Sequence, residues 1–263
     1  MRNEKPYLSE EHAVVTGGGR GIGAAIADEL ARLGASVTLM GRNMEALETH
    51  AAYIARTHET PVAAVRCDVS EAISIELAFA EARAKFGDPY VLVNNAGLGM
   101  AARVGKTSLE MWQRTLAVNL TGPFLCIQHV LPAMIELRGG RIINIASTAG
   151  LAGYSKLAAY TASKHGLVGL TRALALEVAK LGITVNAVCP GYTETDMAQS
   201  AVDNMVTALK KTPSEAREII VSQIPRGVIT QPSEVASLVG WLCAPDARAV
   251  TGQAIAVDGA ELA

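Results

Sequence analysis

The sequence predicts an α/β protein built on a doubly wound, mostly parallel sheet of about seven strands, with helices on both faces. Three observations lead to this fold class. Short β-branched runs alternate with longer segments of helical periodicity, a glycine-rich turn follows the first run, and 50% of the 263 residues are hydrophobic. Parallel neighbours need long return connections, so the intervening helices are right-handed crossovers. A ligand of such a sheet binds at the carboxyl ends of its strands.

The expected strands are short segments rich in Val, Ile and Ala: His12–Thr16, Ser36–Met40, Val62–Arg66, Tyr90–Asn94, Arg141–Ile145, Thr184–Cys189 and Ala254–Val257. No repeat, low-complexity tract or charged linker divides the chain, so we expect a single domain over residues 1–263. After Pro190, roughly forty residues replace the short loop expected in a compact domain. An insertion at this functional edge predicts a helical substrate lid over residues 193–230.

Composition narrows the classes of partner. The 23 basic residues nearly balance the 25 acidic ones, which argues against nucleic acid and against an anionic membrane surface. The N-terminal residues lack the apolar stretch of a signal peptide, and no later run approaches membrane-spanning length, so we expect a cytoplasmic protein with a small-molecule substrate. The cysteines are far apart and predict buried apolar side chains rather than a disulfide or metal site: Cys67, Cys126, Cys189 and Cys243.

The segment Thr16–Gly23 follows the first strand and opens a helix. Glycine lets the backbone turn tightly and approach a pyrophosphate, and the amides of the helix N-terminus favour that negative charge. Gly19, Gly21 and Ala24 satisfy the general dinucleotide fingerprint. A glycine string alone can also be an ordinary turn, but its position between strand and helix favours phosphate binding. The residues of this turn assigned to the cofactor are Gly17, Gly19, Arg20, Gly21, Ile22 and Gly23.

The end of the second strand predicts which dinucleotide binds. The segment Leu39–Asn43 contains no carboxylate that could hold the ribose hydroxyls of NAD. Arg42, helped by Arg20, can instead bind the 2′-phosphate of NADP through charge-assisted hydrogen bonds. The alternative is that both arginines are solvated surface residues. We therefore predict that NADP(H) is preferred over NAD(H).

Tyr160 and Lys164 lie four residues apart on a predicted helix and so share one face. A nearby cation favours the phenolate, so the lysine should lower the pKa of the tyrosine toward the range of acid–base catalysis. Taken alone, such a pair is more often structural. Ser147 ends the preceding strand thirteen residues earlier, where its hydroxyl can hold a substrate oxygen, although a serine there can also cap a turn.

Together these motifs resemble the short-chain dehydrogenase/reductase family over nearly the whole chain. The matching motifs stand in the family's order: Thr16-Gly-x-x-x-Gly21-x-Gly23, Asn94-Asn-Ala-Gly97, Asn119, Ser147, Tyr160-x-x-x-Lys164 and Pro190-Gly191. The resemblance implies a Rossmann-type fold and an NAD(P)-dependent oxidoreductase. It also implies that Tyr160 gives a proton to a carbonyl oxygen during reduction, or removes it from the alcohol during oxidation. Hydride passes to or from the nicotinamide.

The resemblance implies further roles. Ser147 orients the reacting oxygen, Lys164 holds the nicotinamide ribose and lowers the tyrosine pKa, Asn119 positions a water that relays protons, and no metal is required. Local alternatives are a helix cap for Asp68 and turn or stop signals for the others. The remaining residues assigned to the cofactor by resemblance are Asp68, Val69, Asn95, Ala96, Gly97, Pro190, Gly191 and Thr193, with Tyr160 and Lys164. The family also implies a homotetramer, although Ala260 stands where a second glycine is common.

Within the family, the segments Gly140–Gly150, Gly191–Thr195 and Gln231–Ala236 resemble reductases of 3-oxoacyl thioesters and polyketides. This predicts a 3-oxoacyl-CoA or 3-oxoacyl-carrier-protein reductase, or the reverse 3-hydroxyacyl dehydrogenase. Three cations of the expected lid could meet a CoA or phosphopantetheine phosphate or lie on a solvated helix face: Lys210, Lys211 and Arg217. The alternatives are a cyclic, aromatic or steroid ketone as substrate, and a non-catalytic NADP-binding regulator. A nucleic-acid-binding or scaffold role is disfavoured.

Overall fold

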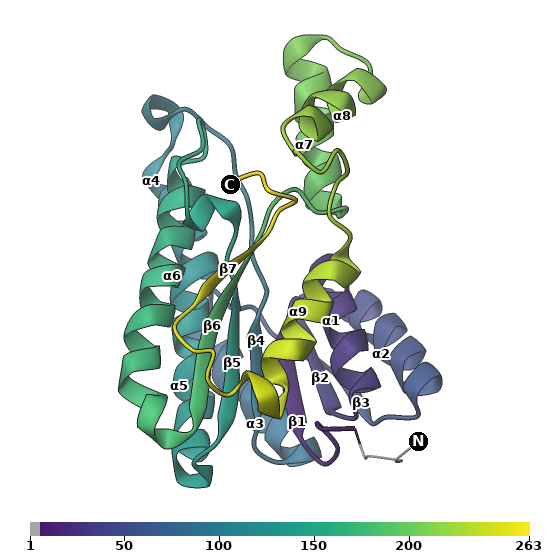
Figure 1. Cartoon of the computed structure of the whole chain (residues 1–263), viewed down its shortest axis with the longest axis vertical. Coiled ribbons are helices and arrows are strands. Elements are labelled where there is room, and N and C mark those ends of the chain that lie inside the picture. Colours follow the sequence, from purple (N-terminus) through teal and green to yellow (C-terminus); the bar gives the residue numbers. More distant parts are fainter. Residues whose placement is uncertain (1–5) are drawn as a thin grey trace.

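The computed structural model describes residues 6–263, apart from the side chains at positions 201, 204 and 208; residues 1–5 of the predicted domain lie outside the described part. Its strands form one parallel sheet in the order β3-β2-β1-β4-β5-β6-β7, with helices on both faces (Figure 1). The predicted fold class is therefore confirmed. The strands are β1 (His12–Thr16), β2 (Ser36–Gly41), β3 (Val62–Arg66), β4 (Val91–Asn94), β5 (Gly140–Ile145), β6 (Ile183–Pro190) and β7 (Ala254–Val257).

One face of the sheet carries three helices: α1 (Gly21–Arg32), α2 (Met44–His58) and α9 (Pro232–Cys243). Leu30 of α1 and Val239 of α9 are fully buried in the apolar core that joins these helices to the strands. Helix α9 begins with Pro at its first position and a capping box between Gln231 and Glu234, so its start is defined by the local sequence. The packing of this layer fixes the position of the glycine turn, because α1 begins directly at that turn.

The other face carries α3 (Ala72–Phe86), α4 (Leu109–Leu116), α5 (Gly122–Leu137) and α6 (Ala158–Val178), with a π turn, η2 (Ala117–Thr121), between α4 and α5. The continuous stretch Leu109–Leu137 is apolar and long enough to span a membrane by length and composition, contrary to the sequence-based expectation. Its side chains Cys126 and Val130 are fully buried against the sheet. It is therefore a core helix of this layer. Short 3-10 turns complete the fold: η1 (Val104–Lys106), η3 (Thr148–Gly150), η4 (Ala179–Leu181) and η5 (Pro245–Ala247).

Helices α7 (Asp196–Leu209) and α8 (Pro213–Ser222) project beyond the carboxyl edge of the sheet (Figure 1). A bridge between Thr193 and Thr230 closes the base of this segment, at the two ends of the predicted lid. The segment has a small apolar core of its own: Val202, Ala216, Ile220, Ile224 and Ile229. It therefore packs largely on itself, above the edge where the strands end.

Candidate active site

The glycine turn fits a pyrophosphate. Gly17 and Gly21 have φ values of +67° and +55°, which side-chain-bearing residues rarely adopt. A Cβ at Gly23 would collide with the carbonyl oxygen of Gly17, so only glycine allows α1 to start this close to the turn. Arg20, at the N-cap of α1, makes no side-chain cap, and the first-turn amides are left to bind an anion.

Asn95 braces this turn against β4. Its Nδ2 donates to the carbonyl oxygens of Thr16 and Gly17 at 2.9 and 3.3 Å. The hydroxyl of Thr16 in turn accepts from the backbone nitrogens of Asn95 and Ala96, both at 3.0 Å. Gly97 follows, and a Cβ there would lie 3.7 Å from Nζ of Lys164. The structure thus links the glycine turn to the predicted catalytic lysine through the end of β4.

A cavity of about 330 Å³ lies at the ends of β2 and β3, lined by Arg42, Arg66, Asp68, Ser74 and Leu77. Arg42 is 4.0 Å from the carboxylate of Asp68. Burial alone would raise the pKa of Asp68, but hydrogen bonds from Ser70 and the charge of Arg42 lower it below its ordinary value. The N-cap of α3 is Glu71, so Asp68 is not the cap of that helix. Sequence reasoning missed Arg66, whose position beside Arg42 depends on strand pairing.

Arg20 does not line this cavity. Its guanidinium lies 3.0 Å from Asp196, at the start of α7, and both side chains are largely exposed. Thr195 also approaches the turn, since its Cγ2 would be 3.2 Å from a Cβ at Gly21. The first turn of α7 therefore lies against the predicted phosphate cradle.

Helix α6 places Tyr160 in its first turn and Lys164 in the next. Nζ of Lys164 lies 5.7 Å from the centroid of the Tyr160 ring and donates to the carbonyl oxygen of Ile145 at 2.8 Å. The lysine is only 4% exposed, and this burial lowers its pKa to about 8. Lys164 can therefore exchange a proton near neutral pH.

The pKa of Tyr160 is raised above its ordinary value, which corrects the expected direction. Burial of the phenol is the largest cause, and the hydrogen bond with Ser147 offsets it only in part. The ammonium of Lys164 points to the Ile145 carbonyl, and spacing on a helix reveals neither this nor the burial. Ser147 also caps η3 by accepting from the backbone nitrogen of Ala149 at 3.1 Å, so it is both a turn former and a partner of the phenol.

Asn119 lies in the π turn and is 1% exposed. Its Oδ1 accepts from the backbone nitrogen of Leu98, and its Nδ2 donates to the Leu98 carbonyl, both at 2.9 Å. Nδ2 also donates to Ser163 Oγ at 3.1 Å, and that hydroxyl donates to the carbonyl of Tyr160 at 2.6 Å. The π turn thus ties the catalytic helix to the end of β4. Sequence reasoning missed Ser163, and its only signal was a polar residue on a buried helix face.

The end of β6 holds the remaining predicted residues. Gly191 donates its N–H to the carbonyl of Val257 at 3.2 Å, and its carbonyl accepts from Thr193 Oγ1 at 3.1 Å. Thr193 is 5% exposed. Pro190 ends β6 opposite Val257. These contacts fix the loop that joins β6 to α7. Val69, also predicted at the cofactor, is 7% exposed and packs in the apolar core on the face of the sheet that carries α3 and α5. Its carbonyl faces Gly122.

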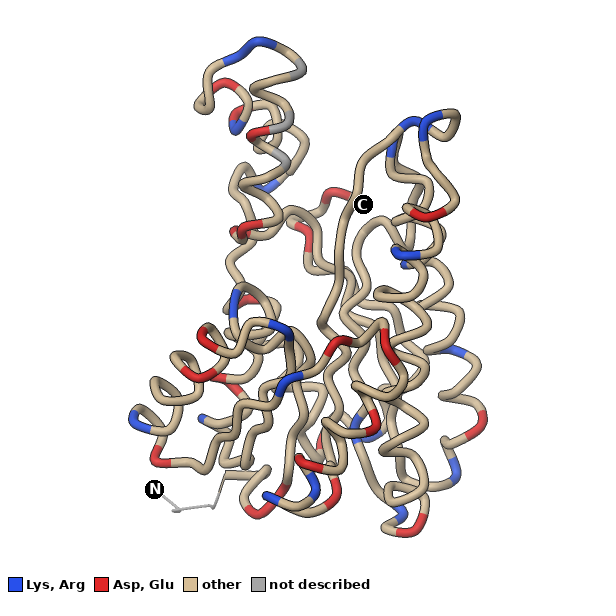
Figure 2. Tube along the Cα trace, turned by 180° about the vertical axis from the view of Figure 1, so that it is seen from behind, with Lys and Arg blue, Asp and Glu red and all other residues tan. Residues whose placement is uncertain are grey.

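Two of the three predicted lid cations, Lys211 and Arg217, are engaged in ion pairs. Arg217 forms two hydrogen bonds to the carboxylate of Glu194, and Lys211 lies 3.8 Å from Glu215. These contacts favour the solvated-helix interpretation for both residues. Figure 2 shows acidic and basic residues interspersed along the chain, with no large region of one sign.

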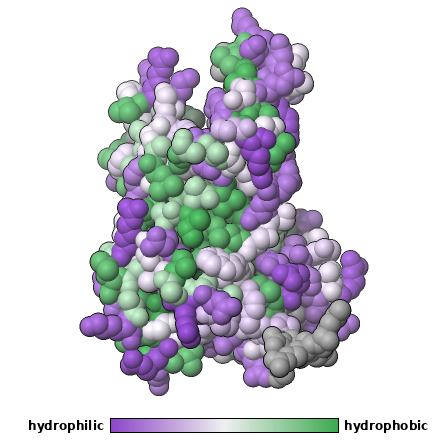
Figure 3. Space-filling model, in the orientation of Figure 1, coloured by the Kyte–Doolittle hydropathy of each residue, from purple (hydrophilic) through white to green (hydrophobic). Residues whose placement is uncertain are grey.

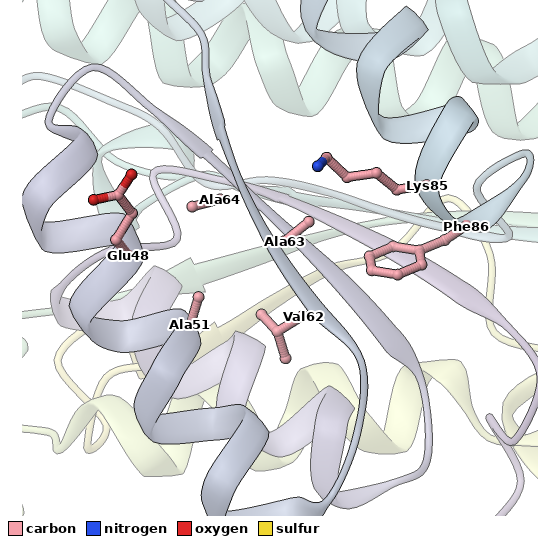
Figure 4. Close-up of a pocket in the computed structure, with 7 residues that line it drawn as sticks. All are labelled: Glu48, Ala51, Val62, Ala63, Ala64, Lys85 and Phe86. Carbon is pink, nitrogen blue, oxygen red and sulfur yellow. The ribbon is translucent and has the colours of Figure 1, made fainter.

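A second cavity, of about 520 Å³, lies away from this site. It runs along the edge strand β3, between Glu48 of α2 and Phe86 of α3 (Figure 4). None of the predicted catalytic residues lines it. Among the described residues, no three His, Cys, Asp or Glu side chains are placed to share a metal ion, and the four cysteines are free and buried.

The chain is similar to known oxidoreductases. The family model described as short chain dehydrogenase matches residues 11–206. A solved actinorhodin polyketide ketoreductase, crystallised with NADPH, has a TM-score of 0.92 and 42% identity, covering 95% of this chain and 96% of that one. A Streptomyces coelicolor protein named for an expected ketoacyl reductase activity is 43% identical over 95% of this chain and 96% of its own. The structure of levodione reductase has a TM-score of 0.90 and 31% identity, covering 96% and 97%.

Proposed function

The chain belongs to the short-chain dehydrogenase/reductase family, and on that premise we propose that it reduces 3-oxoacyl thioesters with NADPH, or oxidises the 3-hydroxyacyl product. The thioester is one of CoA or of a carrier protein. The observation that carries this proposal is the cluster of Ser147, Tyr160 and Lys164, in which Ser147 hydrogen-bonds the partly buried phenol and the buried lysine lies beside its ring. Similarity to a polyketide ketoreductase and to a ketoacyl reductase supports the substrate class.

In this mechanism the substrate oxygen accepts hydrogen bonds from Ser147 and Tyr160. The raised pKa of Tyr160 keeps the phenol protonated, which suits proton donation to a carbonyl oxygen. When bound, NADPH supplies the hydride. Lys164, with a pKa of about 8, holds the nicotinamide ribose. It also lies close enough to the Tyr160 ring to help the phenol regain its proton after the reaction. Asn119 and Ser163 keep the catalytic helix at a fixed distance from β4.

For the cofactor we propose the predicted residues of the glycine turn, the end of β4 and the Pro190–Thr193 loop. The uncapped first turn of α1 suits the pyrophosphate. Arg42 and Arg66 share a cavity that suits a 2′-phosphate, and no carboxylate stands at the end of β2. This chemistry supports a preference for NADP(H).

Initial rates with acetoacetyl-CoA and either NADPH or NADH test both parts. We expect kcat/KM to favour NADPH by on the order of tenfold or more, because a charge-assisted contact is lost with NADH. Arg42→Ala should remove most of this preference while leaving the NADH rate nearly unchanged. The matched control is Arg56→Ala, which changes an exposed arginine within α2. A preference for NADH in the unmodified enzyme would overturn the cofactor proposal.

The second candidate substrate is a cyclic ketone, which the similarity to levodione reductase favours. A cyclic diketone assayed beside acetoacetyl-CoA separates the two proposals by kcat/KM. If neither substrate is turned over and NADPH still binds, the third interpretation, a non-catalytic NADP-binding regulator, is preferred.

We also propose a cytoplasmic homotetramer. Strand β7 pairs only with β6, and its residues Ile255 and Val257 are partly exposed. Figure 3 shows apolar residues gathered in the middle of the face where Figure 1 shows β6 and β7. An exposed apolar edge of this kind supports association between copies. Light scattering should give a mass about four times the 27.5 kDa of one chain.

A further inference from the structure

The chain ends in an ordered turn that follows β7. Both carboxylate oxygens of Asp258 accept backbone hydrogen bonds, from Ala260 at 3.0 Å and from Leu262 at 3.1 Å. The carbonyl of Gly259 accepts from the backbone nitrogen of Arg226, at 3.1 Å, in the segment that follows α8. The turn is thereby fixed to the base of the lid, and Glu261 projects from it at a defined position.

The side chain of Glu261 lies between two loops of the candidate active site. Its Oε1 accepts a hydrogen bond from the hydroxyl of Tyr154, which stands between Ser147 and Tyr160 in the sequence. Its Oε2 would be 2.6 Å from a Cβ at Gly191, in the loop that follows β6. The carboxylate therefore lies where the loop after Ser147 meets the loop expected to hold the nicotinamide.

This carboxylate has an unused acceptor and no cation beside it. Oε2 is buried and has no hydrogen-bond partner among the described residues. Arg226, the arginine of the neighbouring segment, forms two hydrogen bonds to Glu234 instead. Asp258 also approaches this loop, since a Cβ at Gly191 would lie 3.0 Å from the Cβ of Asp258. Burial, followed by the charge of Glu261, raises the pKa of Tyr192 in the same loop, so the field of this carboxylate reaches the site.

We propose that Glu261 selects the charge of the substrate. Its negative charge disfavours ketones that carry a carboxylate one methylene away from the reacting carbonyl, and so favours neutral 3-oxo esters and thioesters. In a medium of effective dielectric about 20, two like charges within about 10 Å of each other repel strongly enough to change affinity by about tenfold. A neutral substrate meets no such repulsion. This inference rests on the proposed 3-oxoacyl activity and narrows its substrate class.

A matched pair of ketones tests the inference. Acetoacetate and its ethyl ester share the reacting carbonyl and differ in one negative charge, so their kcat/KM ratio with NADPH isolates the effect of charge. We expect the unmodified enzyme to prefer the ester. Glu261→Gln should raise the ratio of acetoacetate to ester about tenfold, because the neutral amide keeps the size and loses the charge. Tyr154→Phe removes the partner of Glu261 but keeps the carboxylate, and should change that ratio by less than about twofold.

Binding gives a second measurement that does not need turnover. The same two ketones are titrated into the NADPH complex of the Tyr160→Phe variant, with and without Glu261→Gln or Tyr154→Phe, and binding is followed by cofactor fluorescence before turnover. A ratio of dissociation constants that Glu261→Gln leaves unchanged, or that Tyr154→Phe shifts equally, would overturn the charge-selection proposal. Absence of turnover with the ester and with acetoacetyl-CoA would instead remove the proposed 3-oxoacyl activity, while the binding ratio still decides the role of Glu261.

Discussion

Two regions of the molecule are held by different forces. One is the set of residues around Tyr160, called the catalytic floor, and the other is the segment 193–230, called the lid. In the floor, Asn119, Ser163 and Lys164 are at most 4% exposed. Asn119 donates a hydrogen bond to the Ser163 hydroxyl, and Ser163 and Lys164 donate to backbone carbonyls. In the lid, α7 and α8 share a small apolar core and surface ion pairs. Buried networks rigidify, whereas a segment with few contacts to the main core can open locally. The comparison indicates that the residues proposed for the chemistry are held rigidly, whereas the segment proposed as the substrate lid is more independent of the main core.

The largest expected effect lies in the floor. Tyr160→Phe removes the proton donor but keeps the partly buried ring, so kcat should fall by about 10²–10⁴-fold. Thermal unfolding should shift little. Tyr53→Phe, which changes an exposed tyrosine on α2, is the matched control and should keep full activity. Near-normal turnover in Tyr160→Phe would show that another group donates the proton.

A matched pair of core truncations compares the two regions directly. Ile220 of α8 and Ile75 of α3 are both fully buried, and each Ile→Ala change should cost about 2–4 kcal/mol where it acts. For Ile220→Ala we expect this loss only in the hydrogen exchange of α7 and α8, with unchanged urea unfolding of the sheet. Ile75→Ala should lower the global unfolding free energy. If both variants lower it equally, the lid does not open independently.

The buried charge of Lys164 should lower the stability of the folded chain. Its pKa of about 8 in the folded chain lies below the ordinary 10.5, so the unfolded chain binds the proton more tightly. The stability of the unmodified enzyme should therefore rise between pH 8 and 10.5, and the penalty is complete below pH 8. Lys164→Met should stabilise the chain by about 2 kcal/mol at pH 7, after allowing for the lost bond to Ile145.

Urea unfolding at pH 7 and at pH 10.5 checks this sign. The stabilisation by Lys164→Met should shrink at the higher pH, where the unmodified lysine is neutral in the folded chain and half-protonated in the unfolded chain. The exposed Lys180→Met should show no such pH dependence. A stabilisation that is equal at both pH values would mean that packing, not the buried charge, is responsible.

The positions of the strands along the chain and the residues of the main motifs could be predicted from sequence because their signals are local. The glycine turn follows a strand directly, and Tyr160 and Lys164 lie on one helix. The contacts that connect these motifs are not local. Ile145 and Lys164 meet only because β5 and α6 pack together, and the Tyr154–Glu261 bond joins residues 107 positions apart. The wrong direction for the Tyr160 pKa has the same origin, since spacing gives a neighbour but not its burial.

The smallest expected effect lies where the two regions touch, at the ion pair between Arg20 and Asp196. Both side chains are more than three-quarters exposed, so the pair itself adds little stability, but it holds an arginine that is proposed to serve the cofactor phosphates. Asp196→Asn should free Arg20 and lower the KM for NADPH about two- to threefold at low ionic strength, with the difference closing in high salt. Glu194→Gln breaks a pair within the lid and should leave this KM unchanged. If both variants change it alike, general loosening of the lid, rather than release of Arg20, governs cofactor entry.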